Sequence, residues 1–194
     1  MTYVAATALE CSALRRALPG ERVVQTGVAL ANVDDSLGEI VVSCGLAGGL
    51  REDLPTGTLL IPREVGRPGA RTLRCDPELV DAFARSARGL GIEPVFDPLL
   101  TSDAIVNGSA RARWAAEGYA GVDMETGRIV APRVAAVRVI LDTPQRELSS
   151  DWSIPLLAML KPWNWPQAFW LAREAPRAAA LVARVVAAAQ GIGP

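Results

Sequence analysis

The sequence of 194 residues has no histidine, three cysteines and a single lysine. Without histidine, a Ser-His-Asp triad, a histidine metal site and an imidazole general base are excluded. Cys11, Cys44 and Cys75 are odd in number and far apart, so they provide neither a zinc spacing nor a disulfide framework, which is typical of a reducing cytosol. Because Lys161 is the only lysine and the Walker motif is missing, a P-loop is excluded as well.

A strong charge of either sign is also missing. The 20 basic and 21 acidic residues leave a net charge of −1, which gives no electrostatic footprint for nucleic acid. The first residues, MTYVAATALE, have no basic n-region and no long apolar h-region, so we expect no secretory signal. Half of the residues are apolar, which is enough for a sizeable core, and the length predicts one domain.

Short apolar runs alternate with helical stretches along most of the chain. The predicted strands are Tyr3–Ala8, Arg22–Thr26, Ile40–Cys44, Thr58–Ile61, Val95–Leu100, Gly121–Asp123 and Val134–Leu141. The predicted helices are Glu10–Ala17, Ala29–Leu37, Pro77–Gly89, Ser109–Glu117, a short one after Met124, and a terminal one over about Gln167–Gln190. This alternation predicts a three-layer αβα sandwich with a central mixed, largely parallel twisted sheet.

The last part of the chain differs in composition. We expect an α/β domain over residues 1–150 and a helical, Trp-rich extension over 151–194 that packs on the same domain. The stretch from Trp152 to Trp170 contains four of the five tryptophans. It is long enough to span a membrane, but its three prolines argue against a spanning helix. Two interpretations stay open: a helix pair that packs on the domain or on a second subunit, and a hydrophobic lip that contacts a membrane interface or a lipid substrate.

Ligands of parallel sheets bind outside the carboxyl ends of the strands, so the residues that follow strands are informative. The predicted strand Ile40–Cys44 leads into a glycine turn that contains Gly45, Leu46, Ala47 and Gly48. Such a turn lets the backbone approach a ligand and frees N–H groups to face an anion or a hydroxyl, although glycines also occur there for steric reasons. The turn is not GxGxxG and leads into another strand, so a dinucleotide site does not fit.

Carboxylates stand at the other strand ends, and each has two interpretations. Asp142 follows an apolar strand, where burial would raise its pKa and suit a general acid, or it caps the next turn. Glu125 can bind a diol with Met124 flat against a sugar, or they are a helix-start glutamate and a core methionine. Asp123 is a candidate for substrate binding, or it caps the turn that follows the strand. Glu10 polarises a water or begins the helix that follows the first strand.

Four segments, taken in order, resemble the nucleoside phosphorylase and nucleosidase superfamily: SCGLAGGLREDLPTGTLLIP, TSDAIVNGSA, GVDMET and VRVILD. That superfamily combines a Gly-rich AGGL turn and a downstream L-x-x-G with a VDME or VEME signature and a late strand that ends in Asp. The resemblance covers Glu10 to Asp142. The chain is similar to methylthioadenosine/S-adenosylhomocysteine nucleosidases, and GLAGGL and the tail most resemble the hopanoid-associated phosphorylase branch, whose members act as adenosylhopane nucleosidases.

The resemblance implies a role for each candidate residue. Asp142 matches the acid that protonates the purine leaving group at N7, and Glu10 matches the glutamate that positions the attacking water. Glu125 matches the carboxylate that binds the ribose hydroxyls, and Met124 matches the residue against the sugar. The segment beside the base is matched by Ala104, Ile105 and Val106.

The chain also departs from the pattern of the superfamily. Leu46 replaces a serine of the AGG turn, and Ile105 replaces the aromatic residue that stacks on the base in methylthioadenosine nucleosidases. An N-terminal hairpin is missing before Arg22, and Pro132 interrupts the helix after the Met-Glu pair. These losses leave open a degenerate member that binds a purine or a lipid without chemistry. Retention of all three candidate carboxylates argues against that interpretation.

The resemblance thus implies hydrolysis of the N-glycosidic bond of an adenosine derivative, with adenosylhopane as a candidate, and implies no metal or organic cofactor. Phosphorolysis is the alternative and needs a cradle of arginine and hydroxyl groups. Arg15, Arg51 and Arg63 lie near predicted strand ends, but Leu46 removes a hydroxyl, which favours hydrolysis.

The tail leaves its own question open. It suits a bulky apolar 5′ substituent, or it serves as an interaction module. Members of the superfamily are commonly dimers or larger, and the apolar tail predicts a homodimer. We expect a cytoplasmic protein. Peripheral contact with the inner face of the membrane through Trp152 to Trp170 stays open as the alternative to packing of this stretch on the domain or on a second subunit.

Overall fold

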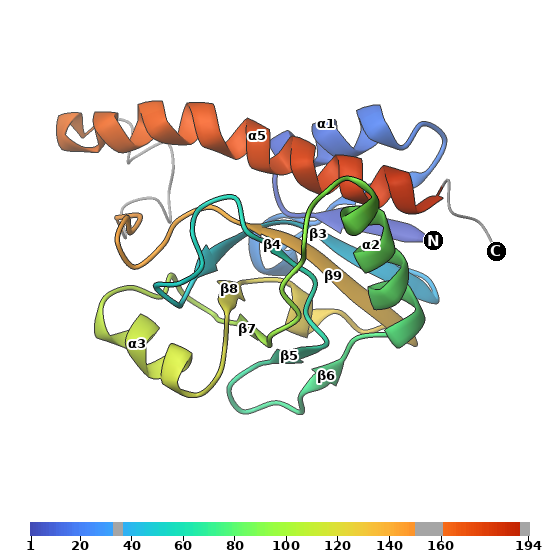
Figure 1. The fold of residues 1–194 in the computed structure, drawn as a ribbon, viewed down its shortest axis with the longest axis horizontal. Helices are drawn as coiled ribbons and strands as arrows, with labels where there is room; N and C mark the ends of the chain where they lie inside the picture. The colour runs from blue at the N-terminus through green and yellow to red at the C-terminus, as the bar shows by residue number, and fades with distance from the viewer. Residues whose placement is uncertain (33–36, 150–160, 191–194) are drawn as a thin grey trace.

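The computed structural model describes residues 1–32, 37–149 and 161–190. The elements in chain order are β1 (Thr2–Ala5), α1 (Ala8–Ala17), β2 (Arg22–Gln25), the 3₁₀ turn η1 (Val28–Leu30), β3 (Ile40–Gly49), β4 (Leu59–Leu60), β5 (Glu64–Gly66), β6 (Leu73–Arg74), α2 (Pro77–Gly89), β7 (Leu99–Thr101), α3 (Ser109–Ala116), β8 (Gly121–Asp123), the 3₁₀ turn η2 (Thr126–Arg128), β9 (Arg133–Ile140), the 3₁₀ turn η4 (Pro162–Asn164) and α5 (Trp165–Gln190) (Figure 1).

Strand β3 joins the two halves of the sheet. Its residues Ile40–Ala47 pair in parallel with β9, and β1 pairs in parallel with its other edge and with β2. At its end, Gly48 and Gly49 turn to an antiparallel pairing with β8, from which the sheet continues through β7, β5 and β6. The pairs β5–β7 and β7–β8 are parallel, whereas β4–β9 and β5–β6 are antiparallel. The predicted mixed, largely parallel sheet with flanking helices is confirmed.

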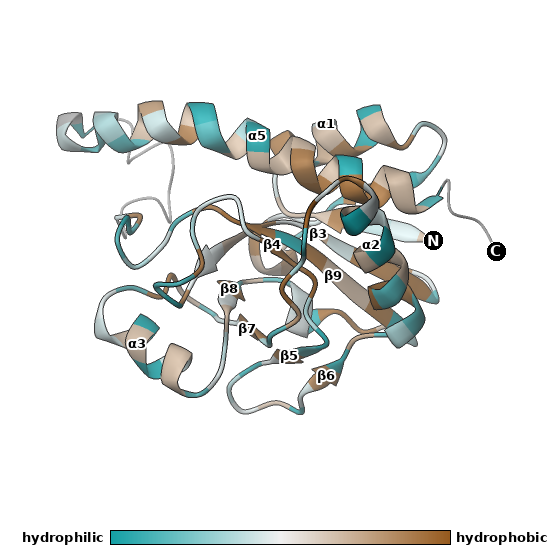
Figure 2. Cartoon of the chain, in the orientation of Figure 1, coloured by the Kyte–Doolittle hydropathy of each residue, from teal (hydrophilic) through white to brown (hydrophobic). Residues whose placement is uncertain are grey.

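One face of β1, β3 and β9 forms the main core with the helices. Helices α1 and α5 lie side by side along this face, and α2 packs against α5 and β9 (Figure 1). The strands are predominantly apolar, whereas α2 and α5 carry polar residues on their outward turns (Figure 2). The opposite face carries a smaller cluster that includes Val41, Ile129 and Val134, and α3 packs beside a third cluster around Leu100 and Val122. The layer that covers this opposite face is therefore thinner than the layer formed by α1, α2 and α5.

The start of α1 corrects the prediction for the first strand. The strand predicted over Tyr3–Ala8 ends at Ala5, because Thr7 caps a helix that begins at Ala8. The Thr7 hydroxyl accepts from the Glu10 N–H at 3.3 Å, and the Glu10 carboxylate accepts from the Thr7 N–H at 2.9 Å. This reciprocal pair is a capping box, for which Thr-x-x-Glu is the sequence signature. Glu10 lies in the first turn of α1 and not at the end of a strand.

The glycine turn expected at Gly45–Gly48 is also wrong, because these residues continue β3. Their backbone pairs first with β9 and then with β8, so the strand bends without a break. Glycine is depleted from strands, which is why the local sequence predicts a turn for this run. Glycine is present at position 45 because of a close contact in the folded protein, since a Cβ on Gly45 would lie 2.3 Å from Oε1 of Glu10.

Three further predictions differ from the structure. The helix expected over Ala29–Leu37 is only the short turn η1 within the residues that are described, with left-handed φ angles of 56° at Ala29 and 61° at Leu30. The strand expected over Val95–Leu100 is confined to β7, which begins after Pro98. Strands β5 and β6 were not expected, because they have three and two residues and are too short for a periodic pattern.

Helix α5 contributes to the main core through its second half. Ala178, Val182 and Val186 are buried there, and Pro176 lies inside the helix. Before and at the start of α5 the aromatic side chains Trp163 and Phe169 are exposed. Residues 150–160, which include Trp152, lie outside the described residues. The domain boundary expected between residues 150 and 151 and the role expected for the Trp-rich stretch therefore stay predictions. In the part of the chain that can be described, no helix combines the length and hydropathy of a membrane span.

Candidate active site

A pocket of about 290 Å³ lies where the ends of β1, β3, β8 and β9 come together. Its lining contains all of the site residues predicted from the sequence except Gly45, namely Glu10, Leu46, Ala47, Gly48, Ala104, Ile105, Val106, Asp123, Met124, Glu125 and Asp142. Segments far apart in the chain therefore meet at one place, as the strand-end argument expects. Gly45 is next to Glu10 and Arg138 but is not among the lining residues. The roles assigned to these residues stay predictions.

Glu10 is held rigidly at one end of the pocket. Its Oε1 accepts from the Leu46 N–H at 2.9 Å, and its Oε2 accepts from the N–H and hydroxyl of Thr7 at 2.9 and 2.6 Å. The position of a Cβ on Gly45 would be 2.3 Å from Oε1 of Glu10 and 2.8 Å from a terminal nitrogen of Arg138. Gly45 thus lets a carboxylate and a guanidinium group approach the same stretch of backbone.

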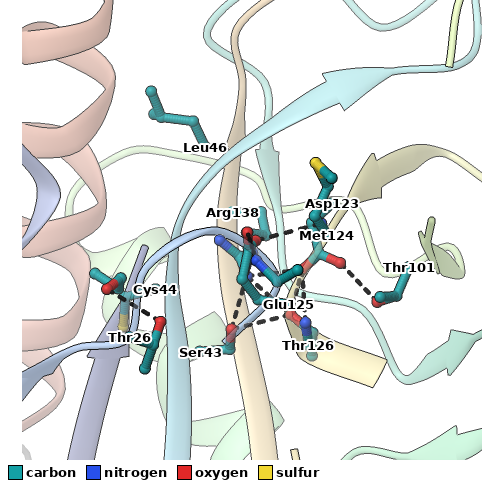
Figure 3. Close-up of polar contacts among 12 residues, drawn as sticks. Thr26, Ser43, Cys44, Leu46, Thr101, Asp123, Met124, Glu125, Thr126 and Arg138 are labelled. Atoms are coloured by element: carbon teal, nitrogen blue, oxygen red, sulfur yellow. Dashed lines mark hydrogen bonds and ion pairs between the residues drawn. The ribbon is translucent and has the colours of Figure 1, made fainter. Parts of the chain in front are cut away.

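Arg138 is a buried arginine in the middle of β9, and the sequence analysis did not include it. Its Nη2 donates to Oγ of Ser43 at 2.7 Å and to Oγ1 of Thr126 at 2.9 Å. The same atom lies 2.7 Å from Oδ2 of Asp123 and 3.6 Å from Oε2 of Glu125 (Figure 3). A charge inside the apolar run VAAVRVIL was the signal that could have identified it.

Three carboxylates surround this one guanidinium group. Burial alone would lower the pKa of Arg138, but the charges of Asp123, Glu125 and Glu10 outweigh burial and raise it. Arg138 therefore stays protonated, paired with Asp123 and Glu125 and in the field of Glu10. The group as a whole has an excess of negative charge, which is costly in a buried site and has to be offset by hydrogen bonds.

Glu125 is held by long contacts only. Its Oε1 accepts from the N–H of Ala29 and its Oε2 from the N–H of Met124, both at the long distance of 3.3 Å. Burial raises the pKa of Glu125, Arg138 only partly lowers it, and the nearby Asp123 raises it further. The residue retains acceptor capacity on a side chain that lines the pocket, as a ligand for hydroxyl groups requires.

Asp123 makes internal contacts instead. Its Oδ1 accepts from the hydroxyl of Thr101 at 2.6 Å, and its Oδ2 accepts from the N–H and hydroxyl of Thr126 and pairs with Arg138. Asp123 precedes the N-cap residue of η2, which is Glu125, and its carboxylate accepts from the N–H of Thr126, the first residue of that turn. Its carboxylate holds Arg138 and η2 in place.

Asp142 lies at the other end of the pocket and is paired with a second buried arginine that the sequence analysis missed. Arg111 of α3 donates from Nη2 to Oδ2 of Asp142. The same guanidinium group donates from Nε to the Val106 carbonyl at 2.9 Å and from Nη1 to the Gly49 carbonyl at 2.5 Å. No local signal in the segment SARARW distinguishes Arg111 from the exposed Arg113.

The remaining wall of the pocket is apolar. It includes Val28, Leu46, Ile105 and Leu148 together with Met124. The half-exposed Val28 places this wall at the surface of the molecule. The pocket thus combines carboxylates at its two ends with an apolar side that faces outward.

The arginines considered for a phosphate cradle lie elsewhere. None of Arg15, Arg51 and Arg63 is among the residues found to line the pocket. Arg51 pairs instead with Asp53 at 2.5 Å and with Asp97 at 2.6 Å. In the described part of the chain, no group of three or more acidic or thiol side chains is arranged to hold a metal ion.

Comparison with known proteins places these observations in a family. The family model described as the phosphorylase superfamily matches residues 23–187. No curated protein matches the sequence. The match covers β2 to the last turns of α5 and includes every pocket residue from Val28 onward.

Solved structures with the same fold come from several bacteria. An S-adenosylhomocysteine nucleosidase from Streptococcus pyogenes, in complex with 5-methylthiotubericidin, has a TM-score of 0.74 and 15% identity, covering 100% of this chain and 96% of that chain. A methylthioadenosine/S-adenosylhomocysteine nucleosidase from Neisseria meningitidis, in complex with methylthio-immucillin-A, has a TM-score of 0.72 and 18% identity, covering 97% of both chains. Futalosine hydrolase of Helicobacter pylori has a TM-score of 0.70 and 11% identity, covering 98% of this chain and 96% of that chain. At these identities the likeness establishes the fold.

Proposed function

The chain belongs to the phosphorylase superfamily, and from this premise we propose that it is a purine nucleosidase. It would hydrolyse the N-glycosidic bond of an adenosine derivative and release adenine. The observation that supports this most strongly is the arrangement of the carboxylates, with Glu10 and Glu125 beside Arg138 at one end of the pocket and Asp142 at the other. The names of the similar structures, which are nucleosidases and a futalosine hydrolase, agree with it.

The proposed mechanism assigns one task to each carboxylate. Cleavage of an N-glycosidic bond passes through a state with positive charge on the sugar, by analogy with glycoside hydrolysis. Glu10 would orient a water and take its proton as the water attacks C1′. Glu125 would bind the ribose hydroxyls and stabilise the developing positive charge. Asp142, which must carry a proton in the substrate complex, would donate it to N7, so that the electron pair of the C1′–N9 bond leaves with a neutral base. Between turnovers Asp142 would take up a proton from solvent, and Glu10 would release the one it took from water.

Two features favour water over phosphate as the nucleophile. The Leu46 N–H, which an anion would need, already donates to Glu10. The positive charge at that end comes from Arg138, which is shared with Asp123 and Glu125. A phosphate dianion would meet an excess of negative charge there and is disfavoured. Phosphorolysis remains the second candidate, because the superfamily includes both reactions.

For the finer identity of the substrate we propose an adenosine derivative with a bulky apolar 5′ substituent, with adenosylhopane as the candidate. The apolar wall formed by Val28, Leu46 and Leu148 supports this proposal, because a polar 5′ group would gain nothing from it. The exposed Trp163 and Phe169 are consistent with contact to a lipid surface. The association with a membrane and the homodimer belong to the same proposal.

The test is the release of adenine, measured by chromatography, from adenosylhopane and from methylthioadenosine, with and without phosphate. We expect release without phosphate, and faster release from the lipid nucleoside. The variant Glu10→Gln keeps the size of the side chain and should lose about 100-fold in rate or more. A strict need for phosphate would make the protein a phosphorylase. If a folded protein releases no adenine under any condition, the enzymatic proposal is wrong.

The raised pKa of Glu125 predicts how substrate binding depends on pH. The ionised carboxylate accepts hydrogen bonds from two hydroxyls, and the protonated form loses part of that capacity. KM should therefore rise as the pH falls, and it should begin to rise at a higher pH than an exposed glutamate would cause. In Glu125→Gln, KM should be higher by about 10-fold or more and no longer change over this range. A wild-type KM that stays constant across the acid range would contradict this role.

The same raised pKa predicts that folding stability and substrate binding respond to pH in opposite directions. Because burial raises the pKa of Glu125 in the folded state, folding favours the protonated form. The stabilising contribution is present at low pH and is lost as the pH rises through the folded-state pKa. At neutral pH, Glu125→Gln should thus leave the free energy of unfolding unchanged or raise it, even though substrate binding is weakened. Urea denaturation of both proteins at neutral pH measures this.

A further inference from the structure

Arg111 is an unusual residue for its position, and the proposed mechanism does not use it. Helix α3 is short, and Arg111 is the one residue of the helix that is fully buried. An isolated arginine is rarely placed in a protein interior, because taking its charge out of water is costly unless it is paired. The cost is met here by a carboxylate of the active site and by backbone carbonyls.

The guanidinium group of Arg111 is fixed from three sides. Nε donates to the carbonyl of Val106, Nη1 donates to the carbonyl of Gly49, and Nη2 donates to Oδ2 of Asp142. On its outer side, Oε1 of Glu147 lies 3.3 Å from Nε. With both backbone contacts made by the planar fork, the position of Nη2 is set before any ligand binds.

This geometry gives the two oxygens of Asp142 different tasks. Oδ2 is occupied by Arg111, so it is not available to a base. Oδ1 lies beside Gly48, at 3.2 Å from the position that a Cβ there would take, and Gly48 lines the pocket. Oδ1 is thus the oxygen that can exchange a proton with a ligand.

We propose that Arg111 is a positioning residue for the proton donor, in the reaction proposed above. It aims Oδ1 of Asp142 at the leaving base and stabilises the carboxylate that remains when the O–H bond of Asp142 breaks and the N7–H bond forms. The C1′–N9 electron pair leaves with the base, so the base departs neutral and the new negative charge stays on Asp142. The contact between Arg111 and Asp142 strengthens as the proton leaves, which lowers the energy of the transition state more than that of the bound substrate.

A pair of substrates with the same sugar separates this role from a structural one. The probes are methylthioadenosine, whose base needs a proton to leave, and 4-nitrophenyl 5-methylthioriboside, whose nitrophenolate leaves without one. In Arg111→Met we expect kcat for adenine release to fall about 100-fold with little change in KM. The rate of nitrophenolate release should change by less than about 3-fold, because no proton donor is involved.

Three further variants complete the test. Arg113→Met lies on the same helix at an exposed position and should change neither rate. Arg111→Lys keeps the charge and should restore part of kcat. The double variant Arg111→Met/Asp142→Asn should release adenine no more slowly than Asp142→Asn alone, because two residues that act as a unit are not additive. The double variant also removes both partners of the buried ion pair, so it stays informative if Arg111→Met does not fold.

The outcomes distinguish this inference from the function on which it rests. Equal losses on both substrates in Arg111→Met and Arg111→Lys, or additive losses in the double variant, would overturn the role of Arg111 and leave the nucleosidase proposal intact. A wild-type protein that is folded but cleaves neither probe nor adenosylhopane would overturn the proposed function, and the inference with it.

Discussion

Asp142→Asn should lower kcat for adenine release by at least about 100-fold, since general acid catalysis contributes roughly 10²–10⁴-fold. The amide cannot donate a proton from the position of Oδ1, and adenine is a poor leaving group without protonation at N7. Release of nitrophenolate from the matched riboside should hardly change. The measurement is the ratio of the two rates in variant and wild type, and it does not depend on the fraction of active protein.

The fold of the variant should be retained, because asparagine still offers an oxygen to Arg111. It cannot supply the negative charge that the ionised form of Asp142 presents to Arg111 in the free enzyme, however, and the guanidinium group then has only the half-buried Glu147 as an ionic partner, at 3.3 Å. We therefore expect a measurable loss of stability, smaller than that of a variant with no acceptor at this position. Asp142→Ala is that comparison. Turnover of methylthioadenosine at the wild-type rate by a folded Asp142→Asn protein would remove Asp142 from the mechanism.

The convergence of the candidate residues could be predicted because strand ends follow a simple rule. Gly48, Asp123 and Asp142 each stand at the end of an apolar run, and strands of one sheet whose ends meet at one edge bring such residues together. The rule needs only the order of strands and their polarity. It does not need exact boundaries, which is why the pocket was found although the first strand was predicted to reach Ala8.

The two buried arginines could not be found in this way. The partners of Arg138 include Ser43, which is 95 residues away in the sequence, and Arg111 binds the Gly49 carbonyl across 62 residues. Whether an arginine is buried depends on such distant partners, and the residues next to it in the sequence do not identify those partners. Arg138 had at least an apolar strand around it, but Arg111 lies in a short polar helix.

The turn that local sequence predicts for the glycine segment is wrong for a related reason. Local preference places glycine in turns, but Gly45, Gly48 and Gly49 are strand residues here because other groups lie where their side chains would be. For Gly48 the nearest groups are Oδ1 of Asp142 and a methyl group of Val122, both at 3.2 Å. The absent side chains thus make room for the active site, although the expected turn does not exist.

Removal of Arg138 should have the largest effect on stability. In Arg138→Met, Asp123 and Glu125 lose their shared counterion in a site where both are buried, and the hydroxyls of Ser43 and Thr126 lose a donor. Breaking a buried ion pair by removing one partner costs about 3–5 kcal/mol. Urea denaturation should show this loss. Arg133→Met, on the same strand but at a half-buried surface pair with Asp76, is the control and should cost less than about 1 kcal/mol.

The dependence on pH and a second substitution identify the cause of this loss. Arg138 lowers the pKa of Glu125, so its removal should raise that pKa beyond the shift that burial already produces. A raised folded-state pKa adds stability at low pH and loses it as the pH rises, so the deficit of Arg138→Met should shrink below neutral pH. The double variant Arg138→Met/Asp123→Asn should recover part of the stability, because it removes one unpaired charge. If the loss of stability is the same at every pH and the double variant recovers nothing, lost packing of the long side chain explains the loss. The excess of negative charge around Arg138, which favours water over phosphate in this pocket, then has no support from the stability measurements.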